Sequence, residues 1–299
     1  MPAGSISKAI ILLVIGNALA VGSDVFVKVM GEDVPIFQFI FLRSLFSLVI
    51  LLPLYRRFDL VTPFDGLPVH ACRSLAGMVG IFCMVVALTS LPLATANAVF
   101  YVAPLLVMLL AVMIFREKLT VLSVFAVFSG FAGIVVILRP VEFNWGALAA
   151  LVGALALAIS AVMVRMLPTQ QSTLHRLFLS YLLLLPVSAV FFVWEGLALE
   201  PRVLMSAVGS GVLILGYSIT VLLAYRDVDA NQVTSAEYTG LIWAVAIGWV
   251  GFAEVPDLWF VAGSLMIVVP LVWLGLNQRQ VKFSATQFSA ASSPPEGPV

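Results

Sequence analysis

Apolar residues dominate the chain in stretches of about twenty residues, and short polar or Gly/Pro-containing breaks separate each stretch from the next. A helix needs about 20 mostly apolar residues to cross the hydrocarbon core of a bilayer. The period-two alternation that is typical of membrane β-barrels is absent. The pattern therefore predicts an all-α polytopic membrane protein with ten transmembrane helices. The expected helices are at residues 9–29, 35–54, 68–89, 93–115, 119–138, 145–168, 173–194, 202–225, 230–252 and 257–276.

The breaks between the stretches are too short to hold a soluble domain. The shortest, Ser90-Leu91-Pro92, predicts a tight antiparallel hairpin of two helices. The first stretch is too long for the apolar core of a signal peptide and lacks a cleavage site, so we expect it to be a helix. Residues 283–299 are rich in Ser, Ala and Pro, and we expect a disordered tail there.

The two halves of the chain resemble each other at one constant offset. A shift of 137 residues places Tyr101 on Tyr238 and Glu117 on Glu254, and many apolar positions match as well. Matches of Tyr and Glu rarely arise by chance in such apolar sequence. We therefore expect two repeats, at residues 8–139 and 145–278.

Each expected repeat contains five helices, which is an odd number, so the second repeat must cross the membrane upside down relative to the first. Inverted repeats are typical of secondary transporters, in which the substrate site lies near the midplane between the halves. The alternative is an old duplication retained only for folding.

Composition agrees with a membrane location. Of the residues, 62% are hydrophobic and 10% are charged, against about 25% charged in a typical soluble domain. The chain carries 15 basic and 15 acidic residues, so it has no basic excess with which to bind nucleic acid. Cys72 and Cys83 lie about 16 Å apart along one expected helix and cannot form a disulfide. His70 and His175 have no acidic cluster near them, so we expect no metal and no cofactor.

Basic residues are distributed unevenly between the two sides of the expected topology. Ten of them lie in loops on the N-terminal side, three lie on the other side, and two, Arg43 and Arg73, fall within expected helices. Lys and Arg are enriched in cytoplasmic loops. We therefore expect a multi-pass protein of the inner (plasma) membrane with both termini in the cytoplasm.

The chain contains no phosphate-binding loop of the Gly-x-x-x-x-Gly-Lys-Ser/Thr type. A transporter of this kind must therefore work by facilitated diffusion, by exchange, or on an ion gradient. We take a proton as the candidate coupling ion.

Two ionisable groups near the outer ends of the first two expected helices are candidates for function, because a charge at a helix centre costs roughly 2.5–3.5 kcal/mol. Asp24 lies four residues before Lys28, on the same helix face. Asp24 is either a gate or substrate contact, or the partner of a Lys28 side chain that extends to the interface. Arg43 lies about 12 Å deep in the second helix; it either binds a substrate carboxylate or forms a structural ion pair with Asp24.

Two more ionisable groups lie in later helices. Arg73 stands near the start of the third helix and is either an interfacial anchor or part of a site. Glu237 lies well inside the ninth helix with no cation adjacent in sequence. Because burial of its negative charge is costly, Glu237 is the best candidate for a coupling or cation-binding carboxylate. The alternative is a hydrogen-bonded contact between helices.

Tyr101 and Tyr238 occupy equivalent positions of the two repeats, so inversion places them at similar depth on opposite halves. Each alone could be a packing residue. Pro104, just after Tyr101, predicts a kink and a freed carbonyl near that depth. Further polar and aromatic candidates for the cavity wall are Asn97, Thr234, Ser235, Tyr217, Trp243 and Asn231.

The chain resembles the EamA type of the drug/metabolite transporter superfamily over about residues 8 to 278. Where that family usually has Gly-Glu after the fourth and ninth helices, this chain has Arg116-Glu117 and Ala253-Glu254, and we interpret these glutamates as structural. The stretches that carry the resemblance are Asp24-Val-Phe-Val-Lys28, Phe41-Leu-Arg-Ser44, Leu91-Pro-Leu-Ala-Thr-Ala96, Tyr101-Val-Ala-Pro104, Phe115-Arg-Glu-Lys118, Gly130-Phe-Ala-Gly133 and Phe252-Ala-Glu-Val-Pro-Asp257.

The resemblance implies a central cavity lined by helices 1, 3, 4, 6, 8 and 9, with helices 5 and 10 at the periphery, and a small organic metabolite as substrate. We expect export by alternating access of an amino-acid-related, zwitterionic or cationic solute, such as an amino-acid-derived metallophore. The alternatives are import of a nucleoside-like or flavin-like metabolite and a membrane-embedded enzyme, for which no reactive constellation is visible. We expect a monomer or homodimer in the lipid bilayer.

Overall fold

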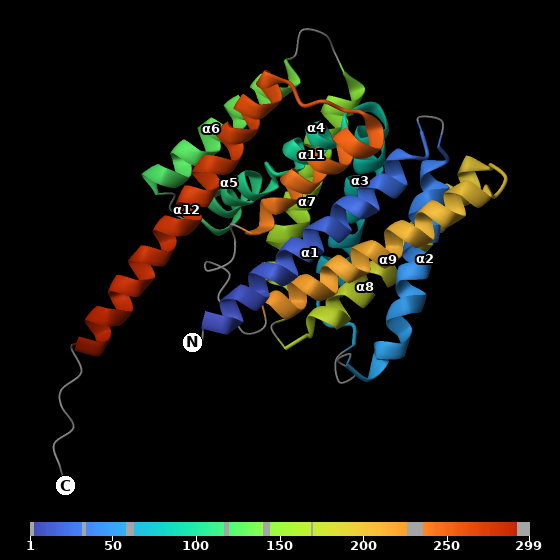
Figure 1. Cartoon of the computed structure of the whole chain (residues 1–299). Helices are drawn as coiled ribbons and strands as arrows, with labels where there is room; N and C mark the ends of the chain where they lie inside the picture. Colours follow the sequence, from blue (N-terminus) through green and yellow to red (C-terminus); the bar gives the residue numbers. More distant parts are fainter. Residues whose placement is uncertain are drawn as a thin grey trace.

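The protein folds as a set of packed helices (Figure 1). The structure, a computed structural model, describes residues 3–31, 34–57, 63–116, 120–139, 144–168, 170–225 and 236–291, and these contain no strand. The helices are α1 (Ala3–Lys28), α2 (Ile36–Leu51), α3 (Leu67–Ser90), α4 (Leu93–Phe100), α5 (Ala103–Phe115), α6 (Val121–Leu138), α7 (Trp145–Met163), α8 (Thr173–Glu195), α9 (Pro201–Ala224), α11 (Thr239–Phe252) and α12 (Leu258–Ala291), with 3-10 turns at Leu52–Arg57 and Val164–Met166.

The prediction of a polytopic helical membrane protein is confirmed. Within the described residues, 8 helical segments are long and apolar enough to cross a membrane, and two shorter apolar helices, Thr239–Phe252 and Leu258–Leu274, follow them. Helices suit this environment because the hydrocarbon core offers no water to satisfy backbone polar groups. We call the face at which α1 begins the N-side and the opposite face the far side.

Short polar residues begin several of the helices. The side chains of Thr120, Asn144 and Ser172 accept hydrogen bonds from backbone N–H groups in the first turns of α6, α7 and α8. These caps satisfy donors that have no partner within the helix. The apolar stretches therefore start at defined residues, close to the boundaries predicted from hydropathy.

The fourth and ninth membrane segments are each interrupted at a tyrosine. The fourth divides into α4 and α5 at Tyr101 and Val102, and the ninth has a turn at Tyr238 just before α11. Pro104 has no N–H to donate to the carbonyl four residues earlier, which accounts for the first break. The kink predicted at Pro104 is confirmed. Since Tyr101 and Tyr238 are 137 residues apart, the two repeats are interrupted at the same position.

The two interrupted segments also end alike. Arg116 follows α5 with φ 55°, and Ala253 follows α11 with φ 54°. These positions are again 137 residues apart. A left-handed backbone costs a non-glycine residue roughly 1–2 kcal/mol. The positive φ explains why a glycine would be favoured at these two positions. Arg116 and Ala253 adopt the same backbone conformation although neither is a glycine.

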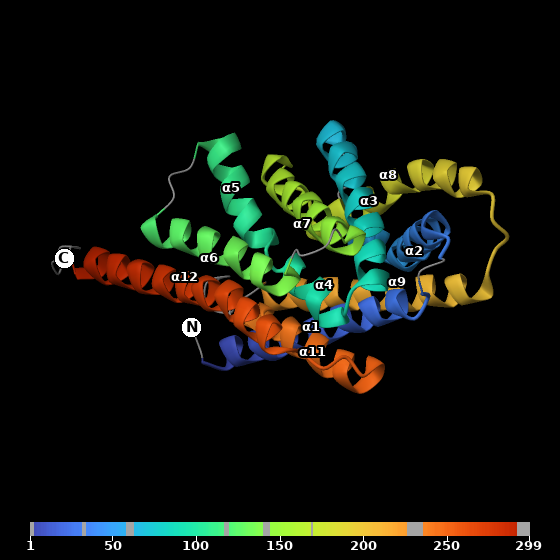
Figure 2. The same cartoon turned by 90° about the horizontal axis from the view of Figure 1, so that it is seen from above.

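The packing of the helices follows the repeat. α1 packs along α9, and α3, the counterpart of α9, packs along α7, the counterpart of α1. The helices α2 and α8, which correspond to each other, pack together, and so do α6 and α12 (Figure 2). The latter pair lies at one edge of the molecule, as expected for the fifth and tenth helices.

The C-terminal helix is longer than predicted. α12 runs for 34 residues to Ala291, which is about 51 Å, whereas a bilayer core is about 30 Å thick. The expectation of a disordered tail from residue 283 does not hold for residues 283–291, where the backbone is helical. The three Ala residues and Gln287 in this part have high helix propensity, which outweighs the lower propensity of its Ser and Thr residues. Residues 292–299 lie outside the described part.

Close contact between α6 and α12 depends on two glycines. A Cβ atom on Gly133 would lie 2.6 Å from the carbonyl oxygen of Gly263, and a Cβ on Gly263 would lie 2.5 Å from the carbonyl oxygen of Gly133. Small residues permit this approach of two helices in a membrane. The backbone on each side leaves no room for a methyl group.

Gly133→Ala should therefore destabilise the protein by about 1–3 kcal/mol, because the added methyl group forces α6 and α12 apart. A lower midpoint of thermal unfolding in detergent would measure this. Gly77→Ala is the matched control, since no atom lies within 4 Å of a Cβ at that helical position. Equal stability of the two variants would contradict the inference that α6 and α12 need a glycine at position 133.

Candidate functional site

The two interruptions of the membrane segments meet inside the protein. The rings of Tyr101 and Tyr238 lie 5.8 Å apart between centroids, at an interplanar angle of 44°. Gly240 permits this contact, because a Cβ there would lie 2.1 Å from the Tyr101 hydroxyl oxygen. The structure thus brings the two repeat-related tyrosines together.

The interruption before α11 is stabilised by hydrogen bonds from the first repeat. The Asn17 side-chain amide donates to the carbonyl oxygens of Ala236 (3.0 Å) and Glu237 (2.9 Å) and lies 3.1 Å from the Thr239 hydroxyl. The Tyr101 hydroxyl also donates to the Glu237 carbonyl, at 3.1 Å. Carbonyl oxygens that would accept backbone N–H groups in a continuous helix therefore accept hydrogen bonds from α1 and from the break between α4 and α5.

The Glu237 carboxylate lies among phenols. The Tyr225 hydroxyl donates to Glu237 Oε1, and Tyr101, Tyr217 and Tyr238 interact with the carboxylate electrostatically. Among the described residues no Lys, Arg or His forms an ion pair with it. This half-buried acid can therefore hold a proton or a cation without displacing a basic side chain.

A second group of polar residues lies nearer the far side. The Asn97 amide on α4 donates to Asp24 Oδ2 at 3.0 Å, and Arg43 on α2 interacts electrostatically with Asp24 and with Tyr181 on α8. No direct ion pair between Arg43 and Asp24 occurs in the described structure. The expected direct contact is thus not present in this structure: Arg43 and Asp24 interact at a distance, and the Asn97 amide is the hydrogen-bond donor to Asp24 Oδ2.

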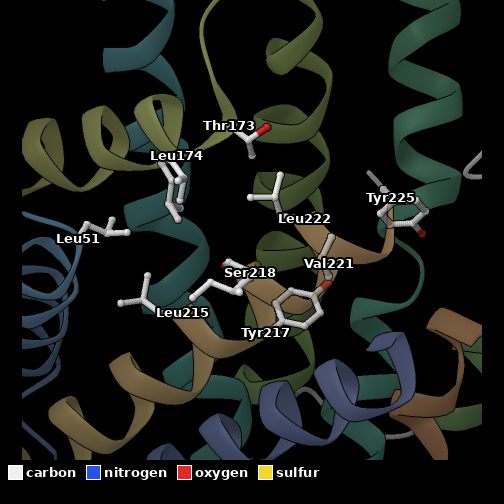
Figure 3. A pocket seen from close by; sticks show the side chains of 11 residues that line it. Leu51, Thr173, Leu174, Leu215, Tyr217, Ser218, Val221, Leu222 and Tyr225 are labelled. Carbon is white, nitrogen blue, oxygen red and sulfur yellow. The ribbon is translucent and has the colours of Figure 1, made fainter. Parts of the chain in front are cut away.

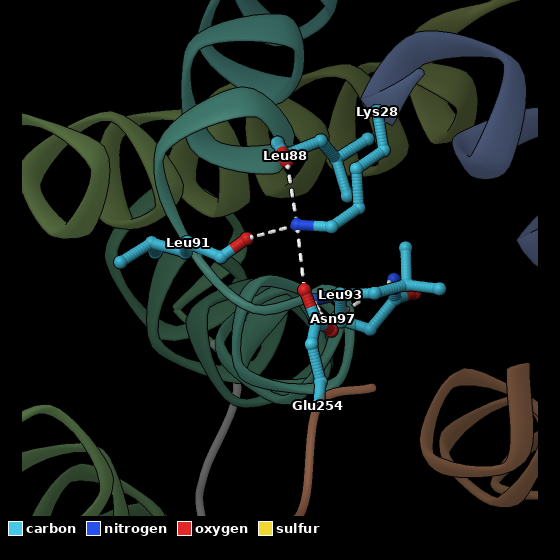
Figure 4. Close-up of polar contacts among 6 residues, drawn as sticks. All are labelled: Lys28, Leu88, Leu91, Leu93, Asn97 and Glu254. Carbon is cyan, nitrogen blue, oxygen red and sulfur yellow. Dashed lines mark hydrogen bonds and ion pairs between the residues drawn. The ribbon is translucent and has the colours of Figure 1, made fainter. Parts of the chain in front are cut away.

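Lys28 connects the two repeats at the far side of the molecule, and its partner is Glu254 rather than Asp24. Lys28 Nζ lies 2.8 Å from Glu254 Oε1 and donates to the carbonyl oxygens of Leu88 (3.3 Å) and Leu91 (2.7 Å) (Figure 4). The other Glu254 oxygen accepts the Leu93 N–H at the start of α4, at 2.7 Å. The alternative in which Lys28 pairs with Asp24 is thus corrected: the side chain extends across to the second repeat.

A small hollow of about 230 Å³ lies beside this ion pair. Its wall includes Thr95, Glu254 and Asp257, and an exposed Arg139–Asp257 ion pair lies at its edge. The Lys28 and Glu254 side chains are only 12% and 19% exposed, so their ion pair is less screened by solvent than the edge pair. The buried pair links α1, α3, α4 and the segment between α11 and α12.

A cavity of about 490 Å³ opens at the opposite end, between α2, α8 and α9 (Figure 3). Leu51, Leu174 and Leu215 give it mainly apolar walls, and Tyr217 and Tyr225 contribute phenol groups. These helix ends belong to the N-side. The helices α2 and α8 were not expected to line a cavity; they do so because α2 packs against both α8 and α9.

The remaining candidates are dispersed. The Trp243 indole N–H donates to the carbonyl of Val14 at 3.1 Å, away from Asp24. The Arg73 Nε donates to the carbonyl of Ser160 at 3.2 Å. Thr234, like Asn231 and Ser235, lies outside the described residues. No group of three metal-ligating side chains occurs in the part of the chain that is described.

Sequence reasoning missed two participants, Asn17 and Tyr225. Asn17 is 6% exposed and was the one amide in the middle of the first apolar stretch, which was a signal that could have identified it. Tyr225 stands at the end of α9, and nothing in its local sequence indicates a contact with Glu237.

The same family model matches the chain twice, at residues 7–139 and 144–276, and its description is "EamA-like transporter family". The chain belongs to the EamA-like transporter family. The matched segments together cover nearly the whole described structure.

Relatives of this EamA-like chain are named as transporters. It is 22% identical over 281 residues to the pseudopaline exporter CntI of Pseudomonas aeruginosa (92% of this chain, 98% of the relative). It is 28% identical over 269 residues to the S-adenosylmethionine uptake transporter of Rickettsia prowazekii (86% and 89%). It is 26% identical over 246 residues to the riboflavin transporter of Brucella anthropi (78% and 86%).

Among solved structures, a crystal structure shares the fold of this EamA-like protein with a TM-score of 0.59 and 22% sequence identity, and the match covers 93% of this chain and 97% of the other. The family and the names of the relatives point to transport of small metabolites in a membrane rather than to an enzyme. They differ in substrate and in direction.

Glu254→Gln should loosen the far side, because Lys28 loses its counter-charge while the amide oxygen still accepts the Leu93 N–H. Loss of a charge-assisted hydrogen bond of about 1.5–3 kcal/mol predicts at least a tenfold faster opening. The readout is labelling by an impermeant maleimide of a Thr95→Cys variant in nanodiscs, with Cys72 and Cys83 replaced by Ser.

Asp257→Asn is the control for this measurement. It removes the charge of an exposed ion pair at the same hollow, which is worth little, and it keeps an oxygen for the Phe260 N–H. We expect unchanged labelling. If Glu254→Gln labels no faster than this control, the buried pair does not close the far side.

Proposed function

We propose that this EamA-like protein is a secondary active transporter that exports a small amino-acid-related, zwitterionic or cationic metabolite across the inner membrane. The observation that carries the proposal is the meeting of the two interrupted segments at Tyr101 and Tyr238, with Glu237 beside them. Interrupted helices at the interface of two repeats are typical of the binding sites of secondary transporters.

The energy source follows from what the described chain contains. Its helices belong to the membrane segments, and the sequence has no phosphate-binding loop. A gradient must then drive accumulation, and we assign proton coupling to Glu237. Protonation of Glu237 would change its hydrogen bonding with Tyr225, and Tyr225 also lines the N-side cavity.

The two faces of the molecule support alternating access. The cavity of about 490 Å³ lies at the N-side, while Lys28 and Glu254 close the far side. With both termini in the cytoplasm, as the distribution of Lys and Arg predicts, the described conformation receives solute from the cytoplasm. Repeats of opposite orientation can exchange roles, which would produce the outward-open state.

The substrate class rests on the polar groups near the interruptions. One carboxylate among tyrosines, with a second carboxylate at Asp24, suits a solute that carries an amine. The alternative is import of a nucleoside-like or flavin-like metabolite, which the names of the S-adenosylmethionine and riboflavin transporters favour.

Deletion of the gene should change one small amine-bearing metabolite. For an exporter, we expect this solute to accumulate inside the mutant cells and to fall in the medium, and untargeted mass spectrometry of both fractions would detect it. Loss of the solute from the interior would indicate import instead. Unchanged metabolite pools, with turnover of a lipid by the purified protein, would contradict transport.

Glu237→Gln should abolish coupled flux while the fold survives, because the amide keeps an acceptor for the Tyr225 hydroxyl but cannot bind a proton. In proteoliposomes with an imposed pH gradient, we expect uptake of the identified solute to fall at least tenfold or to become independent of pH. Loss of pH-dependent uptake without loss of the fold is the result expected when a proton-binding carboxylate is replaced by an amide of the same shape.

Glu200→Gln is the matched control, since Glu200 is a partly exposed carboxylate that lies 3.6 Å from Arg202 at the far side. It should transport like the wild type. Undiminished and still pH-dependent flux in Glu237→Gln would remove Glu237 from the coupling mechanism.

A further inference from the structure

A cluster of unsatisfied polar groups surrounds Arg43 on α2. Arg43 is 5% exposed, and Ser44 and Ser47 are 0% exposed. Within the described structure, Arg43 Nε and Nη1 and both serine hydroxyls have no hydrogen-bond partner. Leaving a buried donor unsatisfied costs about 1–3 kcal/mol, and more when the group is charged. A native protein rarely leaves so many buried polar groups without a partner, so a ligand that supplies the missing partners is one explanation of the cluster.

The surroundings of Arg43 do not neutralise its charge directly. Its guanidinium group lies 5.8 Å from the centroid of the Phe39 ring, and it interacts with Asp24 only at a distance. The Asn97 amide donates to Asp24. A guanidinium remains charged in a protein, so Arg43 presents an unpaired cation within the membrane segment.

The N-side cavity leads towards this cation. The cavity lies between α2, α8 and α9, and its wall includes Leu177 and Leu215. One helical turn beyond these residues lie Tyr181, which interacts with Arg43, and Gly211, where a Cβ would be 3.9 Å from the Arg43 side chain. The cluster therefore lies about one helical turn beyond the wall of the cavity, on the same three helices, and a ligand that reached it would have to move side chains in between.

We infer that Arg43, with Ser44 and Ser47, binds the carboxylate of an amphipathic zwitterion that enters from the N-side cavity, and that Asp24 balances its ammonium group. This rests on the proposed function, for which it defines the substrate class. The planar guanidinium fork matches a carboxylate, and the serine hydroxyls supply further donors.

Charge balance selects this class of ligand. Arg43 and Asp24 together carry no net charge, so a zwitterion adds none, whereas a phosphate dianion would place two negative charges beside one cation in a medium of low dielectric. The cavity of about 490 Å³ has mainly apolar walls, which suits a ligand with a large apolar or aromatic body.

Ligand derivatives test the assignment on the wild-type chain. The purified protein in detergent is screened with the proteinogenic L-amino acids, and binding is measured as a shift in Tm. For each hit, the amide, the amine without a carboxylate, and the carboxylate without an amine are compared. For an aromatic hit these are L-phenylalanine, L-phenylalaninamide, phenethylamine and 3-phenylpropanoate, with inorganic phosphate added as a separate probe.

We expect the zwitterion to bind best, the plain carboxylate more weakly, and the amide and the amine at least tenfold more weakly than the zwitterion. Arg43→Gln should reduce affinity for the zwitterion at least tenfold, the loss expected for a charge-assisted hydrogen bond. Arg43→Lys should retain part of it, because lysine keeps the charge but not the fork. Arg202→Gln, at an exposed arginine, is the control.

Several results would overturn the assignment. With the wild-type protein, these are the absence of any Tm shift with carboxylate-bearing probes, equal binding of the zwitterion and its amide, and an equal Tm shift with inorganic phosphate. With the variant, the overturning result is unchanged binding in Arg43→Gln. The comparison of derivatives needs no variant, so it stands even if Arg43→Gln fails to fold. Carboxylate binding that depends on Arg43 without any solute flux would retain this site and reject the proposed transport.

Discussion

The need to satisfy backbone hydrogen bonds in the hydrocarbon core determines how the two repeats fit together. The fourth and ninth membrane segments both break at a tyrosine, which frees backbone groups where no water is available. Asn17 and Tyr101, both from the first repeat, donate to the Glu237 carbonyl in the second. The contact between the repeats therefore supplies hydrogen-bond partners at the interruption before α11. The same association adds Tyr101 of the first repeat to the tyrosines of the second repeat, Tyr217, Tyr225 and Tyr238, that interact with the Glu237 carboxylate.

The charged groups inside the molecule differ in the partners that they find. At the far side, Lys28 is shared between Glu254 and two carbonyls, and the other Glu254 oxygen caps α4. The Glu237 carboxylate accepts a hydrogen bond from the Tyr225 hydroxyl and has no ion pair with a basic side chain of the described residues. Arg43 lies against the Phe39 ring, and its Nε and Nη1 have no hydrogen-bond partner among the described residues. The far side thus holds a paired charge, whereas two nitrogens of Arg43 in the interior have no hydrogen-bond partner among the described residues.

Much of the fold could be predicted because hydropathy is a local property of the chain. Stretches of about twenty apolar residues can only be helices in a membrane, and α3, α6 and α8, for example, begin and end near the predicted boundaries. The kink at Pro104 was predictable for the same reason, since a missing N–H is a property of one residue. The helix over residues 283–291 was not, because composition alone did not separate helix propensity from disorder.

Partners between distant residues could not be predicted in this way. Asp24 and Lys28 share a helix face, yet their partners are Asn97 and Glu254, because side chains on different helices lie closer in space. The sequence by itself determined the class of protein, the repeat and which charges are costly, since these depend on residue type and spacing. Only the tertiary structure decided which charges are paired and where a cavity lies, because both depend on how helices from the two repeats pack.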